Sequence, residues 1–170
     1  MGLFTSKEFS TLDDLLVEQL QDLYDAEHRL CDAIPKMAEA ATSPQLKTAF
    51  QDHLTETKSH VKRLEQAFDL LGKDADRDSC QAMKGIIKEG SDVVDAKGDS
   101  AVKDAALIAA AQRVEHYEMA GYGSARNFAK QLGQDRVAQL LQQTLDEEGE
   151  ADKKLTQIAE GLINTQAANA

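Results

Sequence analysis

Four segments of this sequence place a glutamate where an amphipathic helix would turn an apolar side chain towards the core. Apolar residues recur in each segment at spacings of three and four, the period of one helix face. Glu27, Glu56, Glu115 and Glu148 lie on those faces. Carboxylates are almost never fully buried unless a partner balances them. Four carboxylates that converge on one interior need a strong counter-charge, and two divalent or trivalent metal ions would supply it.

Imidazole side chains accompany the carboxylate of the second segment. His53 precedes Glu56 by three residues and His60 follows it by four, so all three are expected on the inner face. We expect at least one of the two histidines to bind metal, and the spacing leaves open which one. Glu147 and Glu150 are expected on the solvent side. The full set of expected metal ligands comprises Glu27, His53, Glu56, His60, Glu115, Glu118, Glu148 and Asp152.

This ligand set favours a dinuclear iron or manganese centre. Hard oxygen ligands suit oxidised iron and manganese, and imidazole adds affinity for the divalent ions. Glu56 and Glu148 are the expected bridging ligands, because each lies centrally on the second helix of a hairpin. Ser59 and Ala151 stand where the common Glu-x-x-His motif of such centres has histidine. We expect two metal ions per chain, with iron favoured over manganese.

The bulk composition limits the kinds of partner. The 170 residues carry a net charge of −11, only 5% of them are aromatic, and Trp is absent. Nucleic acid binding requires a concentrated basic surface and is therefore not expected. The sequence has no run of 18 apolar residues and no secretory signal pattern. We therefore expect no membrane association and a cytoplasmic location.

Caps and helix breaks predict an all-α fold, a ferritin-like four-helix bundle in a single domain over residues 1–170. The long helices are expected at about residues 11–41, 44–71, 100–132 and 134–162. Short breaks join them into two antiparallel hairpins, and the crossover at residues 72–99 contains a short helix. One long crossover between two hairpins is typical of ferritin-like proteins. Residues 164–170 are expected to form a frayed tail.

Several motifs recur in a fixed order over about residues 8 to 163. They are Leu23-Tyr24-Asp25-Ala26-Glu27, His53-Leu54-Thr55-Glu56-Thr57, Arg63-Leu64-Glu65, Cys80-Gln81-Ala82-Met83, Val114-Glu115-His116-Tyr117-Glu118, Tyr122-Gly123 and Glu147-Glu148 before Asp152. This series resembles the YciF/YciE-like family of ferritin-like, rubrerythrin-related bacterial stress proteins. The resemblance implies a rubrerythrin-like four-helix core, a homodimer, and a metal site at Glu27, Glu56, Glu115 and Glu148. It also implies that Glu118 is an extra carboxylate ligand.

The expected function is a stress-associated reaction of the dinuclear centre with peroxide or oxygen. Peroxidase-, catalase- and ferroxidase-like activities all remain open, and the sequence assigns no catalytic residue. The sequence has no rubredoxin-like pair of cysteine motifs, so electrons would come from a separate donor. The alternative is a non-enzymatic helical interaction module or structural dimer, with a stabilising metal or none. Its interface could use the outer apolar residues Val17, Leu140 and Leu145.

Overall fold

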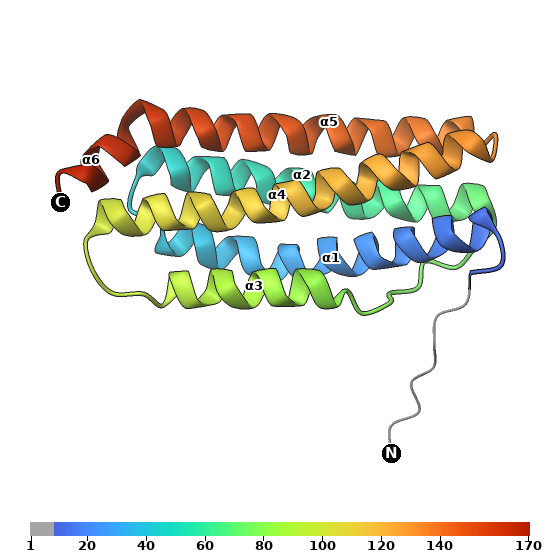
Figure 1. Ribbon diagram of the computed structural model, residues 1–170, viewed down its shortest axis with the longest axis horizontal. Coiled ribbons are helices and arrows are strands. Elements are labelled where there is room, and N and C mark those ends of the chain that lie inside the picture. The colour runs from blue at the N-terminus through green and yellow to red at the C-terminus, as the bar shows by residue number, and fades with distance from the viewer. Residues whose placement is uncertain (1–8) are drawn as a thin grey trace, which may run out of the picture.

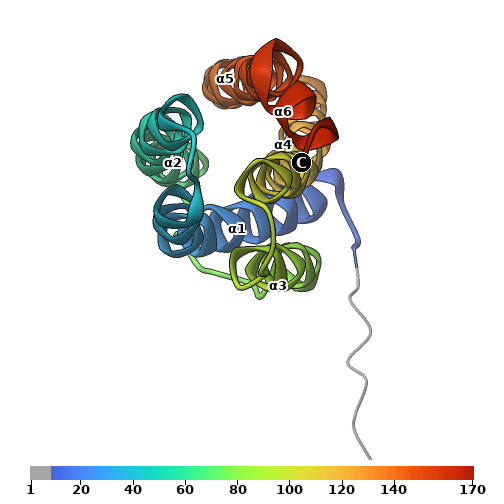
Figure 2. The ribbon, with the colours of Figure 1, turned by 90° about the vertical axis from the view of Figure 1, so that its left-hand side faces the viewer.

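The computed structural model describes residues 9–170, and every regular element among them is a helix. The all-helical prediction is therefore confirmed for this part of the chain. Four long helices lie side by side (Figure 1), and a shorter helix, α3 (Gln81–Val94), lies outside them (Figure 2). α3 packs against α1 and α4. The bounds are Leu12–Ala40 for α1, Pro44–Leu71 for α2, Gln81–Val94 for α3, Ser100–Gln131 for α4 and Asp135–Ile158 for α5.

Local sequence determines where the first two long helices begin and end. The Thr11 hydroxyl accepts a hydrogen bond from the Asp14 amide at 3.1 Å, and the Asp14 carboxylate accepts one from the Thr11 amide at 2.9 Å. These two bonds form a capping box at the start of α1. Ser43 caps α2, and Pro44 stands in its first turn, where a missing N–H costs nothing. Gly72 ends α2 with a φ of +64°, a left-handed conformation that suits glycine.

A buried aspartate joins the turn between α1 and α2 to α4. Asp104 is only 2% exposed. Its carboxylate accepts hydrogen bonds from the Thr42 amide at 2.9 Å, the Thr42 hydroxyl at 2.7 Å and the Ser43 amide at 2.7 Å. Amides at the start of a helix lack an intrahelical partner. Asp104 satisfies these donors and thereby fixes the first hairpin against α4.

A polar layer separates the hydrophobic core into two clusters. One cluster includes Leu30, Phe50, Val114 and Leu155, and the other includes Leu23, Leu64, Tyr122 and Leu141. On each long helix, a buried acidic or imidazole side chain falls between a member of one cluster and a member of the other. Packing of both clusters therefore holds the polar layer in place from two sides.

The C-terminal segment corrects the expectation of a fourth helix up to residue 162 followed by a frayed tail. α5 ends at Ile158, and the chain continues as a five-residue π-helix, Ala159–Ile163, and then as α6, Asn164–Ala168. The wider π turn changes the face that the chain presents, so that Ala159 and Ile163 both join the core. A search for a 3.6-residue period does not detect such a change of register.

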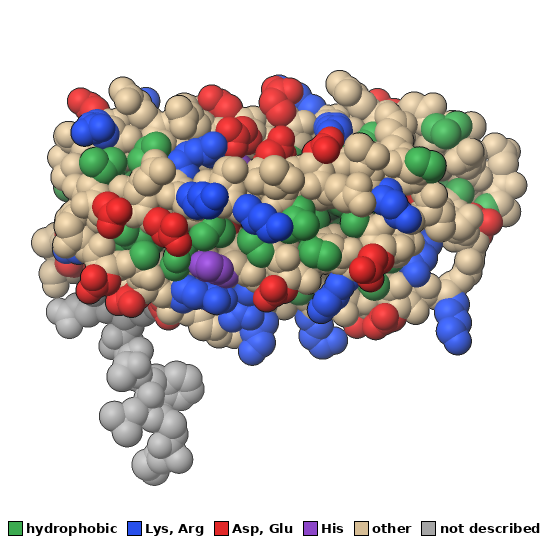
Figure 3. Space-filling view, turned by 180° about the vertical axis from the view of Figure 1, so that it is seen from behind, with side chains coloured by type: hydrophobic (Ala, Val, Ile, Leu, Met, Phe, Trp, Pro, Cys, Tyr) green, Lys and Arg blue, Asp and Glu red, His purple; other side chains and the backbone are tan. Residues whose placement is uncertain are grey.

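The surface carries acidic and basic side chains in mixture. On the face drawn in Figure 3, Lys and Arg are dispersed among Asp and Glu. That face lacks the concentration of positive charge that nucleic acid binding requires. In the part of the chain that the structure describes, no helix is apolar over a length that would cross a bilayer.

Candidate metal centre

Six ionisable side chains meet in the polar layer between the two core clusters. Glu148 and three of the others are 0% exposed, Glu115 is 2% exposed and His53 is 8% exposed. Such burial is rare for charged groups and marks the layer as the candidate site. The six are Glu27 from α1, His53 and His60 from α2, Glu115 and Glu118 from α4, and Glu148 from α5. We refer to these six residues as the central cluster.

The central cluster consists of two groups that share Glu148. One group is His53, Glu115, Glu118 and Glu148, and the other is Glu27, His60 and Glu148. In each group, one potential ligand atom per residue lies within 4.8 Å of the others. Bonds from nitrogen or oxygen to a metal ion are about 2 Å long, so ligands on opposite sides of one ion are about 4 Å apart. The spacing therefore suits one ion in each group, with Glu148 between them.

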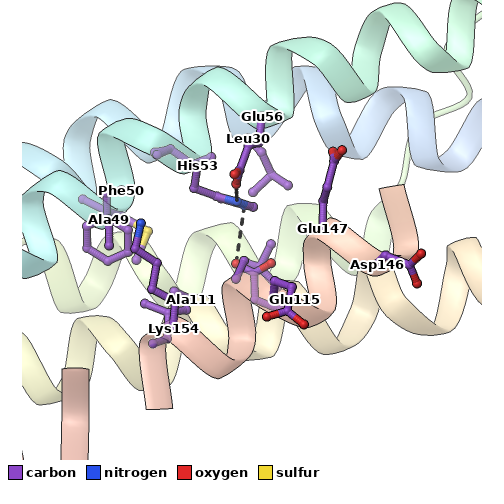
Figure 4. A pocket seen from close by; sticks show the side chains of 16 residues that line it. Leu30, Ala49, Phe50, His53, Glu56, Ala111, Glu115, Asp146, Glu147 and Lys154 are labelled. Carbon is purple, nitrogen blue, oxygen red and sulfur yellow. Dashed lines mark hydrogen bonds and ion pairs between the residues drawn. The ribbon is translucent and has the colours of Figure 1, made fainter. Parts of the chain in front are cut away.

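Each imidazole directs one ring nitrogen at the buried carboxylates. His60 Nδ1 lies 2.9 Å from Glu148 Oε1 and 3.3 Å from Glu27 Oε1. His53 Nε2 lies 3.5 Å from Glu115 Oε1 and 3.9 Å from Glu148 Oε2. Figure 4 shows the His53 side chain reaching from α2 towards Glu115 on α4. The two histidines thus belong to different groups of the cluster.

The other ring nitrogen of each imidazole faces a carboxylate nearer the surface. His60 Nε2 lies 2.8 Å from Glu147 Oε2, and Arg63 donates to the two oxygens of Glu147 at 2.9 and 3.0 Å. His53 Nδ1 lies 3.4 Å from Glu56 Oε2. A carboxylate that holds the proton of one ring nitrogen leaves the other nitrogen free for a metal. These contacts therefore favour the tautomers that a metal site needs.

Tyr122 orients the carboxylate of Glu27. Its hydroxyl donates a hydrogen bond to Glu27 Oε1 at 2.5 Å, and both side chains are fully buried. Burial raises the pKa of Tyr122 well above its ordinary value, and the carboxylates of Glu27 and Glu118 raise it further. The hydroxyl therefore keeps its proton and acts as a donor to Glu27.

The pKa values reveal an excess of negative charge. Burial alone lowers the pKa of both histidines, but neighbouring carboxylates outweigh it and raise the pKa to about 9 for His53 and about 11 for His60. Burial, reinforced by the other carboxylates, raises the pKa of Glu118 well above its ordinary value. Glu115 also has a strongly raised pKa, chiefly because of burial. Bound cations would stabilise the charged carboxylates and so offset the cost of burying them.

Unpartnered polar atoms provide an independent test of whether a metal fits. Ten buried side-chain nitrogens and oxygens in residues 9–170 lack a well-aligned hydrogen-bond partner, and eight of them belong to the central cluster. Each such atom costs about 1–3 kcal/mol when it is left unpaired. Carboxylate and imidazole donors suit iron and manganese ions. The residues present therefore fit a pair of such ions.

Two of the eight expected ligands lie outside the central cluster. The Glu56 side chain is 47% exposed, and its helix instead turns the fully buried Thr57 inwards. Asp152 accepts a hydrogen bond from Gln112 at 3.0 Å and lies 3.4 Å from His116. The structure brings the other six expected residues together.

The sequence reasoning missed the supporting groups around His60. Glu147 was expected on the solvent side, yet this half-buried residue contacts His60 and Arg63. Arg63 also donates to the buried Thr144 hydroxyl at 2.7 Å. The position of Glu147 next to Glu148 gave a signal, because neighbouring residues on a helix can reach the centre and the edge of the same site.

The amino-acid sequence is similar to those of known proteins. Residues 11–168 match a family described as Domain of unknown function, DUF892. The chain is 41% identical to Protein YciF of Escherichia coli strain K12 over 160 aligned residues. The aligned region covers 94% of this chain and 96% of that protein.

Solved structures of other proteins resemble the whole described fold. The E. coli stress protein YciF superimposes with a TM-score of 0.89 over 92% of this chain and 99% of that one, at 41% identity. YcfI from Rhodopseudomonas palustris gives a TM-score of 0.86 at 40% identity, over 90% and 98% of the two chains. A protein from Xanthomonas campestris, at 22% identity, shares the fold with a TM-score of 0.72 over 94% and 98%.

Proposed function

Because the chain belongs to the DUF892 family, over residues 11–168, and is similar to a bacterial stress protein, we propose a stress-associated, dinuclear metal protein that reacts with peroxide or oxygen. In this proposal the chain forms one ferritin-like domain, a four-helix bundle of two hairpins joined by a long crossover, and residues 1–8 of the expected span 1–170 lie outside the described part. The cell compartment is the cytoplasm. Iron is the favoured metal, and manganese is the second choice.

One observation carries the proposal. Four buried carboxylates and two imidazoles converge on one layer, where eight of their polar atoms lack a well-aligned hydrogen-bond partner among residues 9–170. Without a counter-charge this arrangement is destabilising, because burying like charges in a low dielectric costs several kcal/mol per ion. Two bound cations would balance the carboxylates and complete the coordination of the unpartnered atoms.

The ligands divide between two ions. His53, Glu115 and Glu118 would hold one ion, Glu27 and His60 would hold the other, and Glu148 would bridge them. Two redox-active ions in this position would supply the one-electron changes that reduction of peroxide or oxygen requires.

The surrounding residues prepare the site for that chemistry. Tyr122 holds one oxygen of Glu27 in place and keeps its phenolic proton. Glu147, itself held by Arg63, fixes the ring of His60. The two apolar clusters flank the layer and lower its local dielectric, which strengthens the electrostatic interactions of its buried groups. Electrons for repeated turnover would come from a separate donor.

Metal titration and peroxide consumption test the proposal together. Wild-type protein should bind about two Fe²⁺ or Mn²⁺ per chain and consume peroxide faster than the same concentration of free metal. Glu148→Gln removes the shared ligand and should lower both the stoichiometry and the rate, while Glu89→Gln, on the exposed face of α3, should change neither. Two bound ions with no peroxide or oxygen reaction above the free-metal rate would reject the redox function but retain the metal site.

The alternative function is a non-enzymatic structural dimer. YcfI of Rhodopseudomonas palustris is named as a candidate structural protein, and apolar side chains remain at the surface here. Leu70 is 41% exposed and borders the same surface hollow between α2 and α5 as Leu140. A homodimer through this face is expected under either function. Sedimentation equilibrium of wild type and a Leu70→Glu, Leu140→Glu double variant tests it, with a monomeric wild type as the contrary result.

A further inference from the structure

An apolar cavity of about 260 Å³ opens beside the central cluster. Its walls come from all four long helices and include Leu30 and Ile34 of α1, Phe50 of α2, Val114 of α4 and Leu155 of α5. All five of these side chains are buried members of one core cluster. The cavity is therefore an interruption of a packed core, next to groups that could bind metal.

Small residues from three helices create this space. Ala49 on α2, Ala111 on α4 and Ala151 on α5 all line the cavity, at positions where larger apolar residues would fill it. For comparison, a cavity of about 150 Å³ with leucine, isoleucine and phenylalanine walls binds benzene. Natural cores are packed to the density of organic crystals, so a void of this size next to a polar site is unusual.

The inner end of the cavity is polar. His53 and Glu115 line it, and they are more than nine-tenths buried. His53 Nε2 and Glu115 Oε2 both lack a well-aligned hydrogen-bond partner among the described residues. Figure 4 shows the two side chains facing one another across this space. A molecule in the cavity would therefore present its oxygen-bearing end to these two residues.

The mouth of the cavity is acidic. Glu56, Asp146 and Glu150 are exposed lining residues. Lys154 of the lining is paired with Asp52 at 2.9 Å and Glu150 is paired with Lys153 at 2.6 Å, so Glu56 and Asp146 leave the entrance with an excess of negative charge. This excess of carboxylates repels anions from the entrance and leaves uncharged molecules unaffected.

We infer that the cavity binds an uncharged organic molecule with an apolar body and one oxygen-bearing end, of the medium-chain alcohol or alkyl hydroperoxide class. Its body lies between Ala49, Ala111 and Ala151, and its polar end lies at His53 and Glu115. Binding does not require a metal ion, because His53 Nε2 and Glu115 Oε2 face the polar end directly in the metal-free chain. The role of the bound molecule as a substrate or oxidant of the centre rests on the proposed function.

Calorimetric titration of full-length protein with 1-octanol tests the binding site. Octanol should bind saturably, and sodium octanoate at pH 8 should bind at least about tenfold more weakly because of the acidic mouth. Ala151→Leu fills part of the cavity and should weaken octanol binding by about tenfold or more. Ala105→Leu, at a similarly half-buried alanine of α4 outside the cavity, should leave it unchanged.

A crystal structure with 8-bromo-1-octanol locates the site without any variant. Anomalous scattering should place the bromine among the apolar walls, with the hydroxyl at His53 and Glu115. No saturable binding, equal affinity for octanoate, an equal effect of the two leucine variants, or bromine elsewhere would overturn the inference. If the chain binds octanol but takes up no metal, only the proposed function is rejected. If it consumes peroxide in a metal-dependent reaction but does not bind octanol, only this inference is rejected.

Discussion

Gly121 allows α4 to approach α1 closely, immediately beside the tyrosine that contacts Glu27. A β-carbon at this position would lie 2.8 Å from Leu23 Cδ2 and 3.5 Å from Leu23 Cγ. Leu23 is fully buried, so its side chain would have to shift within the core to make room for the added carbon. At Gly123, two residues further along the same helix, a β-carbon would meet nothing within 4 Å. The two glycines therefore form a matched pair for substitution by alanine.

Both substitutions gain helix propensity, but only one creates a clash. Glycine in a helix interior is about 1 kcal/mol less favourable than alanine. Gly123→Ala should therefore raise the free energy of unfolding by about 1 kcal/mol, which corresponds to about 2–4 °C in Tm for a chain of this length. Overpacking at Gly121 costs about 1–3 kcal/mol. Gly121→Ala should thus range from neutral to a loss of about 2 kcal/mol.

Urea denaturation followed by circular dichroism measures this difference directly. The two variants should differ by about 1–3 kcal/mol, with Gly121→Ala the less stable. Gly121→Ala should also weaken metal binding, because Tyr122 moves together with the displaced backbone. Equal stability of the two variants, within about 0.5 kcal/mol, would refute the close approach of α1 and α4 at this point.

Three further predictions concern buried hydrogen bonds. Asp104→Ala leaves three donors unpaired and should lower the free energy of unfolding by about 3 kcal/mol in urea denaturation. The control Asp99→Ala, at an exposed helix cap, should lower it by about 1 kcal/mol. Equal losses would contradict the role of burial. Hydrogen bonds from two arginines and a backbone amide hold the pKa of Asp25 below 3.8, although burial acts to raise it. The stability that this lowered pKa contributes is present above pH 3.8 and is lost as the pH falls through the pKa of the folded state. Asp25→Asn should therefore flatten the dependence of the unfolding free energy on acid pH. An unchanged dependence would reject the role of Asp25 in acid stability. Tyr122→Phe should weaken Mn²⁺ binding by about tenfold in calorimetry through loss of the bond to Glu27, and unaltered affinity would show that Glu27 needs no orienting partner.

The sequence predicted the helical class from patterns that local physics determines. Ser43, Pro44 and Gly72 act at helix ends through their own backbone preferences, and the expected helix at 44–71 compares with Pro44–Leu71 in the structure. The π turn after Ile158 depends instead on how Ile163 packs into the core. Tertiary packing of this kind leaves no periodic signal in a single sequence.

The periodic spacing of residues on one helix face predicted part of the central cluster, and tertiary contacts determine the rest. His53 and His60 are seven residues apart, which is about two helical turns, so they lie on the same face of α2. Between them, spacings of three and four are equally consistent with a 3.6-residue period. The spacing places Glu56 on one face with the two histidines, whereas the structure turns the fully buried Thr57 inwards and leaves the Glu56 side chain 47% exposed. Partners on other helices, such as Arg63 for Glu147, could not be inferred without the fold.

Anomalous diffraction at the iron edge, from crystals of protein loaded with Fe²⁺ without chelator, tests the central claim most directly. We expect two iron peaks per chain on either side of Glu148, one near His53 and the other near His60. A fully folded protein that shows no iron at the central cluster, with its carboxylates hydrogen-bonded to one another and to the imidazoles, would contradict it.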